Sequence, residues 1–194
     1  LSVCDYIIAI SDFDRDDMIS KAPKYSAKYR TIYNPICFKD YCYEEREKKY
    51  ITAINIQWKH KNVDTIINSY AQIARTTDLN LVLVGKPPKN IEELKEIVKD
   101  NNLEDRVVFT GFVSDEQMAT IIQKTRIYIN ASYFEGFGMT SIEMMGSGIP
   151  TIVANNTAQK EVTMGLCRYY EPTNDKFKLA EQILEEIKKP KSET

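Results

Sequence analysis

The chain alternates short apolar runs with longer amphipathic segments from residue 50 to residue 188, and this rhythm constrains the fold more than any other feature. The apolar runs consist of consecutive β-branched and leucine side chains, which is typical of strands buried on both faces. Such strands, when helices separate them, form a parallel sheet. The predicted strands span residues 50–54, 79–84, 106–110, 126–130 and 150–154, with a short last strand at 168–170.

The segments between these runs place apolar residues at helical spacing. We therefore predict an α/β fold with helices on both faces of a parallel sheet. Ser114 and Gln117 give one helix a capping-box start. In such folds, ligands bind at the carboxyl ends of the strands. The helices are predicted at residues 63–74, 91–98, 115–123, 138–145 and 176–188.

Charge and composition exclude several classes of protein. The net charge of −2 gives no sign of a surface for nucleic acid. The four cysteines form no C-x-x-C pair and His60 is the single histidine, so we expect no zinc site and interpret the cysteines as reduced thiols of a cytoplasmic protein. No run approaches the ~20 apolar residues that span a bilayer, and no signal-peptide pattern is present.

A dinucleotide or P-loop site is also disfavoured. A Rossmann dehydrogenase carries G-x-G-x-x-G after its first strand, whereas the corresponding loop here, residues 55–62, contains no glycine. The chain has no G-x-x-x-x-G-K-[ST] sequence either. We therefore expect no cofactor of the NAD type.

The stretch from residue 130 to residue 150 reads as a polar loop, a glycine-rich turn and a helix. Gly136 and Gly138 allow backbone angles that other residues avoid. The first amides of a helix beginning near Gly138 lack partners, and with the positive end of the helix dipole they favour phosphate. Glu135 and Glu143 flank the turn, and we interpret them as acceptors for sugar or ribose hydroxyls. This combination is typical of a nucleotide-sugar site.

This stretch and its continuation carry three short motifs. They are E-G-F-G-x-x-x-x-E at residues 135–143, M-x-S-G-x-P at residues 145–150 and E-V at residues 161–162. Together they resemble the donor-site signature of group 1 (family 4-like) retaining glycosyltransferases of the GT-B fold. The likeness covers about residues 5–188 and is densest at 110–162. It implies the Rossmann-like, C-terminal donor-binding domain of that fold.

The resemblance also implies a reaction. The whole protein would transfer a sugar from a nucleoside diphosphate sugar to an acceptor hydroxyl with retention of configuration, using neither metal nor cofactor. The catalytic residues would be Glu135, which acts on the sugar, and Lys61, which acts on the diphosphate. The Phe137 side chain is expected to pack under the loop. The implied substrate-binding residues of the turn and its helix are Gly136, Phe137, Gly138, Met139, Thr140 and Glu143.

The loop at residues 55–62 departs from the family pattern, which has Gly-Arg near its start and a lysine before the helix. Lys61 fits the lysine, but Asn55 and Ile56 occupy the glycine and arginine positions. Lys59 either replaces the arginine as a substrate-binding cation or is a solvated surface lysine, since an ammonium matches phosphate less well than a guanidinium. The sequence leaves open whether the loss abolishes activity.

Two further features have two interpretations each. Gly111, Phe112 and Val113 follow a predicted strand and resemble the family's base-binding turn, or they are a simple strand end. We interpret His60 as a surface histidine and not as a catalyst.

The N-terminal residues resemble the end of the acceptor-side domain of the same enzymes. Strands are predicted at residues 5–10 and 29–33, and a helix at 12–20 after Ser11. We predict a domain stub at 1–40, a linker at 41–49 and the donor domain at 50–190. Because the chain begins with Leu1, we expect a piece of a longer protein. Two strands cannot bury a core, so the stub should contact the donor domain or self-associate.

The implied partners are a nucleoside diphosphate sugar and a glycan, lipid or small-molecule acceptor, in polysaccharide or glycan biosynthesis. Peripheral membrane association would occur through the missing domain. The fragment alone should bind donor weakly and be nearly inactive. Two alternatives stay open: a nucleotide-sugar-binding module without transfer activity, and a GT-B-type nucleotide-sugar isomerase.

Overall fold

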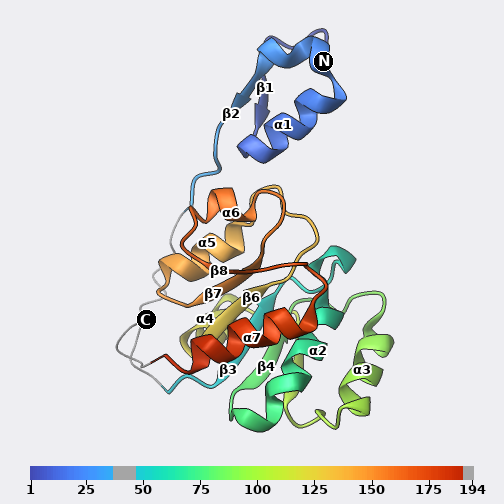
Figure 1. The fold of residues 1–194 in the computed structure, drawn as a ribbon, viewed down its shortest axis with the longest axis vertical. Coiled ribbons are helices and arrows are strands. Elements are labelled where there is room, and N and C mark those ends of the chain that lie inside the picture. The colour runs from blue at the N-terminus through green and yellow to red at the C-terminus, as the bar shows by residue number, and fades with distance from the viewer. Residues whose placement is uncertain (37–46, 190–194) are drawn as a thin grey trace.

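The structure, a computed structural model that describes residues 1–36 and 47–189, contains two parallel sheets (Figure 1). The larger sheet has six strands in the order β5-β4-β3-β6-β7-β8. From β3 the chain moves outward to β5, and from β6 it moves outward to β8 on the other side. The strand order therefore reverses between β3 and β6, and the loops that follow these two strands meet at that point.

The elements of this larger unit agree with the predicted rhythm. Its strands are β3 (Tyr50–Ile54), β4 (Asn80–Val84), β5 (Val107–Gly111), β6 (Thr125–Asn130), β7 (Thr151–Ala154) and β8 (Arg168–Tyr170). Its α-helices are α2 (Val63–Ile73), α3 (Ile91–Asp100), α4 (Asp115–Gln123), α5 (Met139–Gly146), α6 (Gln159–Val162) and α7 (Lys176–Ile187), and two short 3-10 turns are η2 (Lys59–Lys61) and η3 (Ala74–Thr76).

The predicted fold class is confirmed, because all six strands are parallel and helices cover both faces. The capping box of α4 is also present, with Ser114 and Gln117 exchanging hydrogen bonds. Helix α6 was not predicted, because a helix of one turn is too short to show a helical period of apolar residues. The prediction also placed the end of β5 one residue early, before Gly111.

Side chains of each central strand are divided between two apolar layers. Ile51 and Leu81 pack with α2, α3 and α7 on one face, whereas Val82 and Tyr128 pack with α4 and α5 on the other. Because strands buried on both faces have no polar side to present to solvent, they read as continuous apolar runs. This two-sided burial holds the strand ends rigidly at the carboxyl edge of the sheet.

The N-terminal residues form a small unit that lies above α5 and α6 in Figure 1. Its elements are β1 (Ile7–Ala9), α1 (Asp12–Lys21), the 3-10 turn η1 (Pro23–Lys28) and β2 (Tyr29–Thr31). Both strands are shorter than predicted and form a two-stranded parallel sheet. As expected for so small a sheet, the unit contacts the larger one, through Ile10, Phe13 and Ile36. Most of the predicted linker, at residues 41–46, lies outside the described residues.

Two kinds of feature are absent from the described residues. Among residues 1–36 and 47–189, no helix has the length and apolar character to cross a membrane. In the same part of the chain, no three His, Cys, Asp or Glu side chains are grouped so that they could hold a metal ion.

Candidate functional site

Helix α5 begins at the carboxyl edge of the sheet, directly after the glycine-rich turn. Gly138 is its N-cap and has φ +76°, a left-handed conformation that favours glycine. Within the described residues, the amides of Met139 and Thr140 have no acceptor. Free amides at the positive end of a helix attract anions. The predicted start of α5 is therefore present, with its first N–H groups available.

Glu135 lies beside this helix start and is held by three donors. Its Oε1 atom accepts hydrogen bonds from Lys61 Nζ at 2.6 Å, Ser132 Oγ at 2.8 Å and Asn130 Nδ2 at 3.3 Å. The ion pair with Lys61 is largely buried, since the two side chains are only 13% and 16% exposed. Within the described residues, Oε2 of Glu135 accepts no hydrogen bond. One carboxylate oxygen is thus fixed and the other remains available.

Polar residues at the end of β6 fix this arrangement. Asn130 donates to Ser141 Oγ of α5 at 3.0 Å, and its Oδ1 accepts from Ser132 Oγ at 2.6 Å. Both Asn130 and Ser132 are buried, so their hydrogen bonds are well protected from water. These two residues are not among the predicted site residues, although polar side chains at the end of an otherwise apolar strand are a signal that could have indicated them.

The backbone of Glu135 is fixed from the loop after β7. Its N–H donates to Thr157 Oγ1 at 3.1 Å, and its carbonyl accepts from the amide of Ala158 at 3.3 Å. Thr157 itself has φ 45°, which is unusual for a β-branched residue. Backbone strain of this kind is concentrated at functional sites. The loop therefore positions Glu135 by main-chain contacts that the sequence could not indicate.

Glu143 lies one turn after Met139, so both residues are on the same face of α5. Its carboxylate has no hydrogen-bond donor among the described residues. Burial raises the pKa of Tyr128, and the charges of Glu135 and Glu143 raise it further. Met144, next to Glu143 on α5, packs with Tyr128 on the face of the sheet that α4 and α5 cover. Glu135 lies beside the N-cap Gly138 and Glu143 lies in the second turn of α5, and the joint role of the two glutamates stays a prediction.

The loop after β3 explains the departure from the Gly-Arg pattern. Asn55 has φ 65°, and asparagine is one of the few residues that tolerate this left-handed conformation in place of glycine. Ile56 is only 1% exposed and belongs to the core, so its position supplies no cation to the site. Lys61 is the basic residue of this loop that contacts Glu135.

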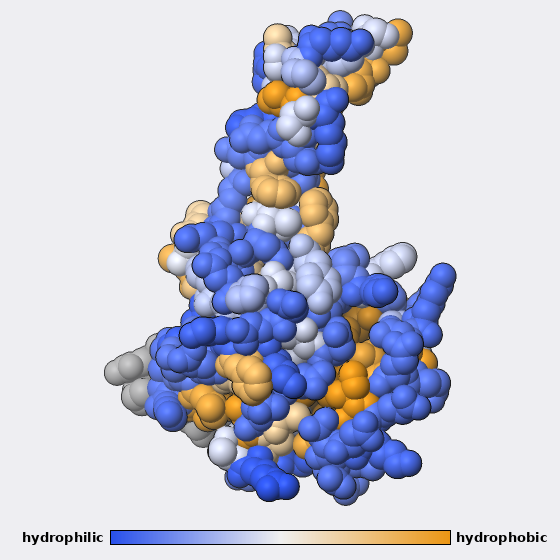
Figure 2. Space-filling model, turned by 45° about the vertical axis from the view of Figure 1, so that its right-hand side comes forward, coloured by the Kyte–Doolittle hydropathy of each residue, from blue (hydrophilic) through white to orange (hydrophobic). Residues whose placement is uncertain are grey.

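Lys59 is exposed and is not part of the Lys61–Glu135 cluster. It lines a hollow of about 270 Å³ between α2 and α3, together with Trp58 and Tyr133. Figure 2 shows apolar atoms exposed on this side of the molecule, next to the polar surface of α3. The substitute role of Lys59 stays a prediction, and the geometry favours the interpretation of a surface lysine.

The remaining predicted residues lie around the same edge of the sheet. Gly111 has φ +69° and pairs with Gly85, while Phe112 is 79% exposed and Val113 packs against the core. Phe137 is buried below the glycine turn, as expected, so only its backbone is available to a ligand. His60 is exposed, and burial of part of its ring together with the charge of Lys61 lowers its pKa. Its carbonyl accepts from the Tyr133 amide, which is a structural role.

Comparisons with known proteins identify the family and the fold of the chain. A family model described as glycosyl transferases group 1 matches residues 43–194. The O-antigen chain mannosyltransferase RfbU of Salmonella typhimurium is 27% identical over 173 residues, which cover 89% of this chain and 48% of that protein. The N-acetyl-alpha-D-glucosaminyl L-malate synthase of Bacillus anthracis is 30% identical over 151 residues, which cover 77% and 39%. The chain therefore spans about half the length, or less, of these relatives.

Solved structures show the same fold. The complex of Anabaena Alr3699/HepE with UDP and glucose superposes with a TM-score of 0.81 at 19% identity, over 95% of this chain and 54% of that one. A glycosyltransferase from Rickettsia africae gives 0.82 at 19% identity, over 94% and 53%. At such low identity, the likeness establishes the architecture of the chain.

Proposed function

The chain belongs to the group 1 glycosyl transferases, and we propose that it is the donor-binding half of a retaining enzyme that transfers a sugar from a nucleoside diphosphate sugar to an acceptor hydroxyl. The observation that carries this proposal is the Glu135 carboxylate, held by Lys61, Asn130 and Ser132 next to the free amides of α5. Anabaena Alr3699/HepE forms complexes with UDP and with UDP-glucose, which supports a nucleotide sugar as the donor here.

Each part of the proposed donor matches a group at the edge of the sheet. The diphosphate binds at the amides of Met139 and Thr140, where the helix dipole and Lys61 Nζ oppose its negative charge. When the bond from the sugar to the diphosphate breaks, charge develops on the departing oxygen. Preorganised donors aimed at such charge lower the barrier most effectively. Lys61 and the α5 amides therefore stabilise the leaving group without a metal ion.

The two glutamates bind the hydroxyl-bearing parts of the donor, which are the sugar and the ribose. Glu135 has one oxygen fixed by protein donors and the other directed to sugar hydroxyls. Glu143, one turn along α5, accepts from the ribose. Carboxylates accept strong hydrogen bonds from hydroxyl groups. Because phosphates repel carboxylates, we assign the two glutamates to the sugar and the ribose and not to the diphosphate. Gly111, Phe112 and Val113 follow the neighbouring strand and are assigned to the base in this proposal.

The titration of this chain with nucleotides tests the proposal. We expect one of UDP, GDP and ADP to bind more tightly than the corresponding monophosphate by about ten-fold, because the second phosphate gains charge-assisted hydrogen bonds. Isothermal titration calorimetry in the presence of a metal chelator measures both constants. Equal affinities for the monophosphate and the diphosphate, or no binding of any diphosphate, would contradict the assignment of α5 as the phosphate site.

A ribose contact at Glu143 predicts a defined change in sugar discrimination. The unaltered chain should prefer the ribonucleoside diphosphate to its 2′,3′-dideoxy analogue by about ten-fold, because Glu143 accepts hydrogen bonds from the ribose hydroxyls. The substitution Glu143→Gln should remove most of that preference while Glu104→Gln, at an exposed loop position, leaves it unchanged. A preference that survives in Glu143→Gln would show that other residues bind the ribose.

The alternatives have less support. The loss of the loop arginine favours a binding module without transfer, but the relatives named above are a transferase and a synthase, and Lys61 is retained in the site. No feature of the described residues favours an isomerase. We propose a cytoplasmic location and a role in glycan synthesis, in line with the O-antigen mannosyltransferase relative.

A further inference from the structure

Glu161 on α6 lies outside the proposed donor site, yet it makes the longest-range contacts of any charged residue described. Its Oε1 accepts from the amide of Asp12 at 2.6 Å, and its Oε2 accepts from the amide of Phe13 at 2.9 Å. The hydroxyl of Tyr33 donates to Oε1 at 2.8 Å. One carboxylate of the larger unit therefore binds both α1 and the segment that follows β2 in the N-terminal unit.

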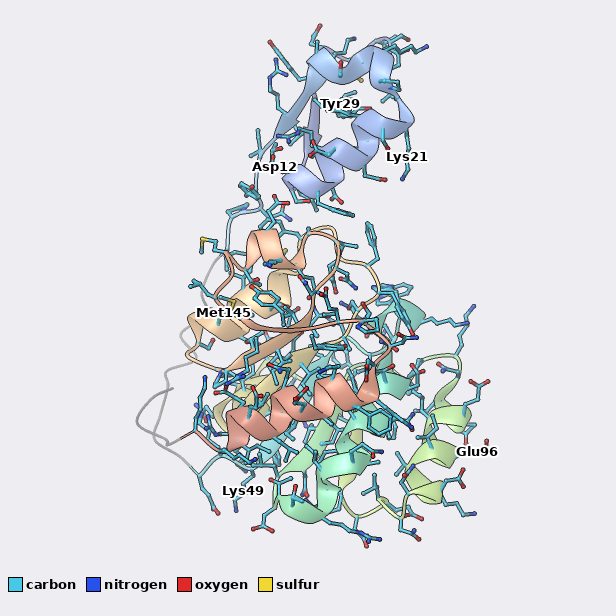
Figure 3. All side chains as sticks on the ribbon, in the orientation of Figure 1. Asp12, Lys21, Tyr29, Lys49, Glu96 and Met145 are labelled. Carbon is cyan, nitrogen blue, oxygen red and sulfur yellow. The ribbon has the colours of Figure 1, made fainter. Side chains whose placement is uncertain are left out.

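These contacts complete the cap of α1. The N-cap Ser11 already satisfies the amide of Asp14, so Glu161 takes the two amides that would otherwise have no partner. A carboxylate at a helix start also interacts favourably with the dipole. In Figure 3 the labelled Asp12 lies at the end of the N-terminal unit that faces α6. The cap of α1 is thus supplied by the other unit.

The surroundings of this contact are apolar and close-fitting. The ring of Phe13 meets Phe134 edge-on at 6.1 Å, and Tyr33 meets Phe137 at the same separation. The Asp14 side chain also lies against this loop, since a Cβ at Gly136 would be 2.8 Å from Asp14 Oδ2. The first turn of α1 therefore lies directly on the loop that carries Glu135.

The loop after β7 and helix α6 connect Glu161 to the donor site. Thr157 and Ala158 bind the backbone of Glu135, and Ala158 is the N-cap residue of α6, three positions before Glu161. One short segment thus holds Glu135 at its start and α1 at its end. Any rotation of α1 away from Glu161 would also remove Phe13 from its contact with Phe134, next to Glu135.

From these contacts we infer that Glu161 is a positioning residue, which fixes the N-terminal unit in one orientation over the mouth of the donor site. The inference rests on the proposed function where it calls that site a donor site. The contact between Glu161 and α1 does not depend on the proposed function. The carboxylate does not touch the donor. It determines the position of the N-terminal unit, and of the side chains on that unit, relative to Glu135.

Distance measurements between two spin labels test this role directly. Labels are placed at Lys21→Cys on α1 and Glu96→Cys on α3, two exposed positions labelled in Figure 3, after the four native cysteines are replaced. We expect one narrow distance distribution in the parent chain and a broad or shifted one in Glu161→Ala. The amides of Asp12 and Phe13 should also exchange with solvent about ten-fold faster or more, because two charge-assisted hydrogen bonds are lost.

The control is Lys160→Ala, the neighbouring position on α6, whose ammonium lies over the Tyr169 ring and not over α1. This variant should keep the narrow distribution. Nucleotide affinity, measured in parallel, should be unchanged in Glu161→Ala, because Lys61 and α5 are untouched. An unchanged distance distribution in Glu161→Ala would overturn the inference. If the parent chain binds no nucleotide, the proposed function fails instead, and the distances still decide whether Glu161 holds the unit.

Discussion

Replacing Lys61 with methionine is expected to weaken the binding of a nucleoside diphosphate by about 10- to 100-fold, the range of one lost charge-assisted hydrogen bond. Two causes act together. The diphosphate loses its nearest cation, and the Glu135 carboxylate, 13% exposed, then faces it without a compensating charge. Calorimetric titration of Lys61→Met with the diphosphate that binds best to the parent chain measures the loss.

The matched control is Lys59→Met, two residues earlier on the same 3-10 turn. Lys59 is exposed and lines the hollow beside α3, so this variant should bind the diphosphate as the parent chain does. Equal losses in the two variants would mean that the loop acts through its overall charge, and would restore Lys59 as a substitute for the missing arginine.

The double variant Lys61→Met/Glu135→Gln separates binding from stability. Lys61→Met leaves a buried carboxylate unpaired, which lowers the free energy of unfolding, whereas a neutral glutamine removes that cost. We therefore expect the double variant to recover stability in urea unfolding but not affinity for the diphosphate. Recovery of affinity would show that Lys61 serves only to neutralise Glu135 and does not contact the phosphates.

The sequence predicted those parts of the molecule that depend on local pattern. The strands are apolar throughout because both of their faces are buried, and that property is visible in any short window of residues. The start of α5 at Gly138 was equally predictable, since the turn requires a left-handed residue and glycine supplies it. The meeting of the Lys61 and Glu135 loops followed from the parallel topology, which places both at one sheet edge.

The contacts that fix the site depend on residues distant in the chain, and no local pattern reports them. Glu161 caps a helix 149 positions away, and its sequence neighbours give no sign of that partner. Thr157 holds the backbone of Glu135 across 22 positions, through a conformation that β-branched residues rarely adopt. The burial of Ile56 could not be predicted either, because a loop position before a helix does not indicate whether its side chain points to the core or to solvent.

A second large effect is expected far from the site, at the ion cluster that joins β8 to α7. Arg168 Nε donates to Glu186 Oε2 at 2.6 Å, and Lys189 Nζ lies 2.9 Å from the same oxygen. Glu186 is only 2% exposed. Removal of one partner from a buried pair costs about 3–5 kcal/mol, because it leaves a buried charge without full compensation. Lys189 still contacts Glu186, so we expect Arg168→Ala to lower the free energy of unfolding by about 3 kcal/mol, the low end of that range.

Urea unfolding at pH 7 measures this loss, and Glu185→Ala is the matched control. Glu185 binds the same guanidinium at 2.7 Å but is 49% exposed, so its removal should cost less than about 1 kcal/mol. Similar losses in Arg168→Ala and Glu185→Ala would mean that the buried carboxylate is not the source of the effect.

The dependence of this loss on pH identifies Glu186 as its origin. Burial alone raises the pKa of Glu186, but hydrogen bonds from Lys189 and Arg168 outweigh burial, and the pKa in the folded chain lies below its ordinary value. The carboxylate therefore contributes stability above the unfolded-state pKa, and this contribution disappears as the pH falls through the folded-state pKa. In Arg168→Ala, burial is less well opposed, so the pKa rises and the contribution is reduced or reversed at pH 7. The difference in unfolding free energy between the parent chain and Arg168→Ala should thus shrink on acidification, and a difference independent of pH would assign the loss to packing of the arginine stem.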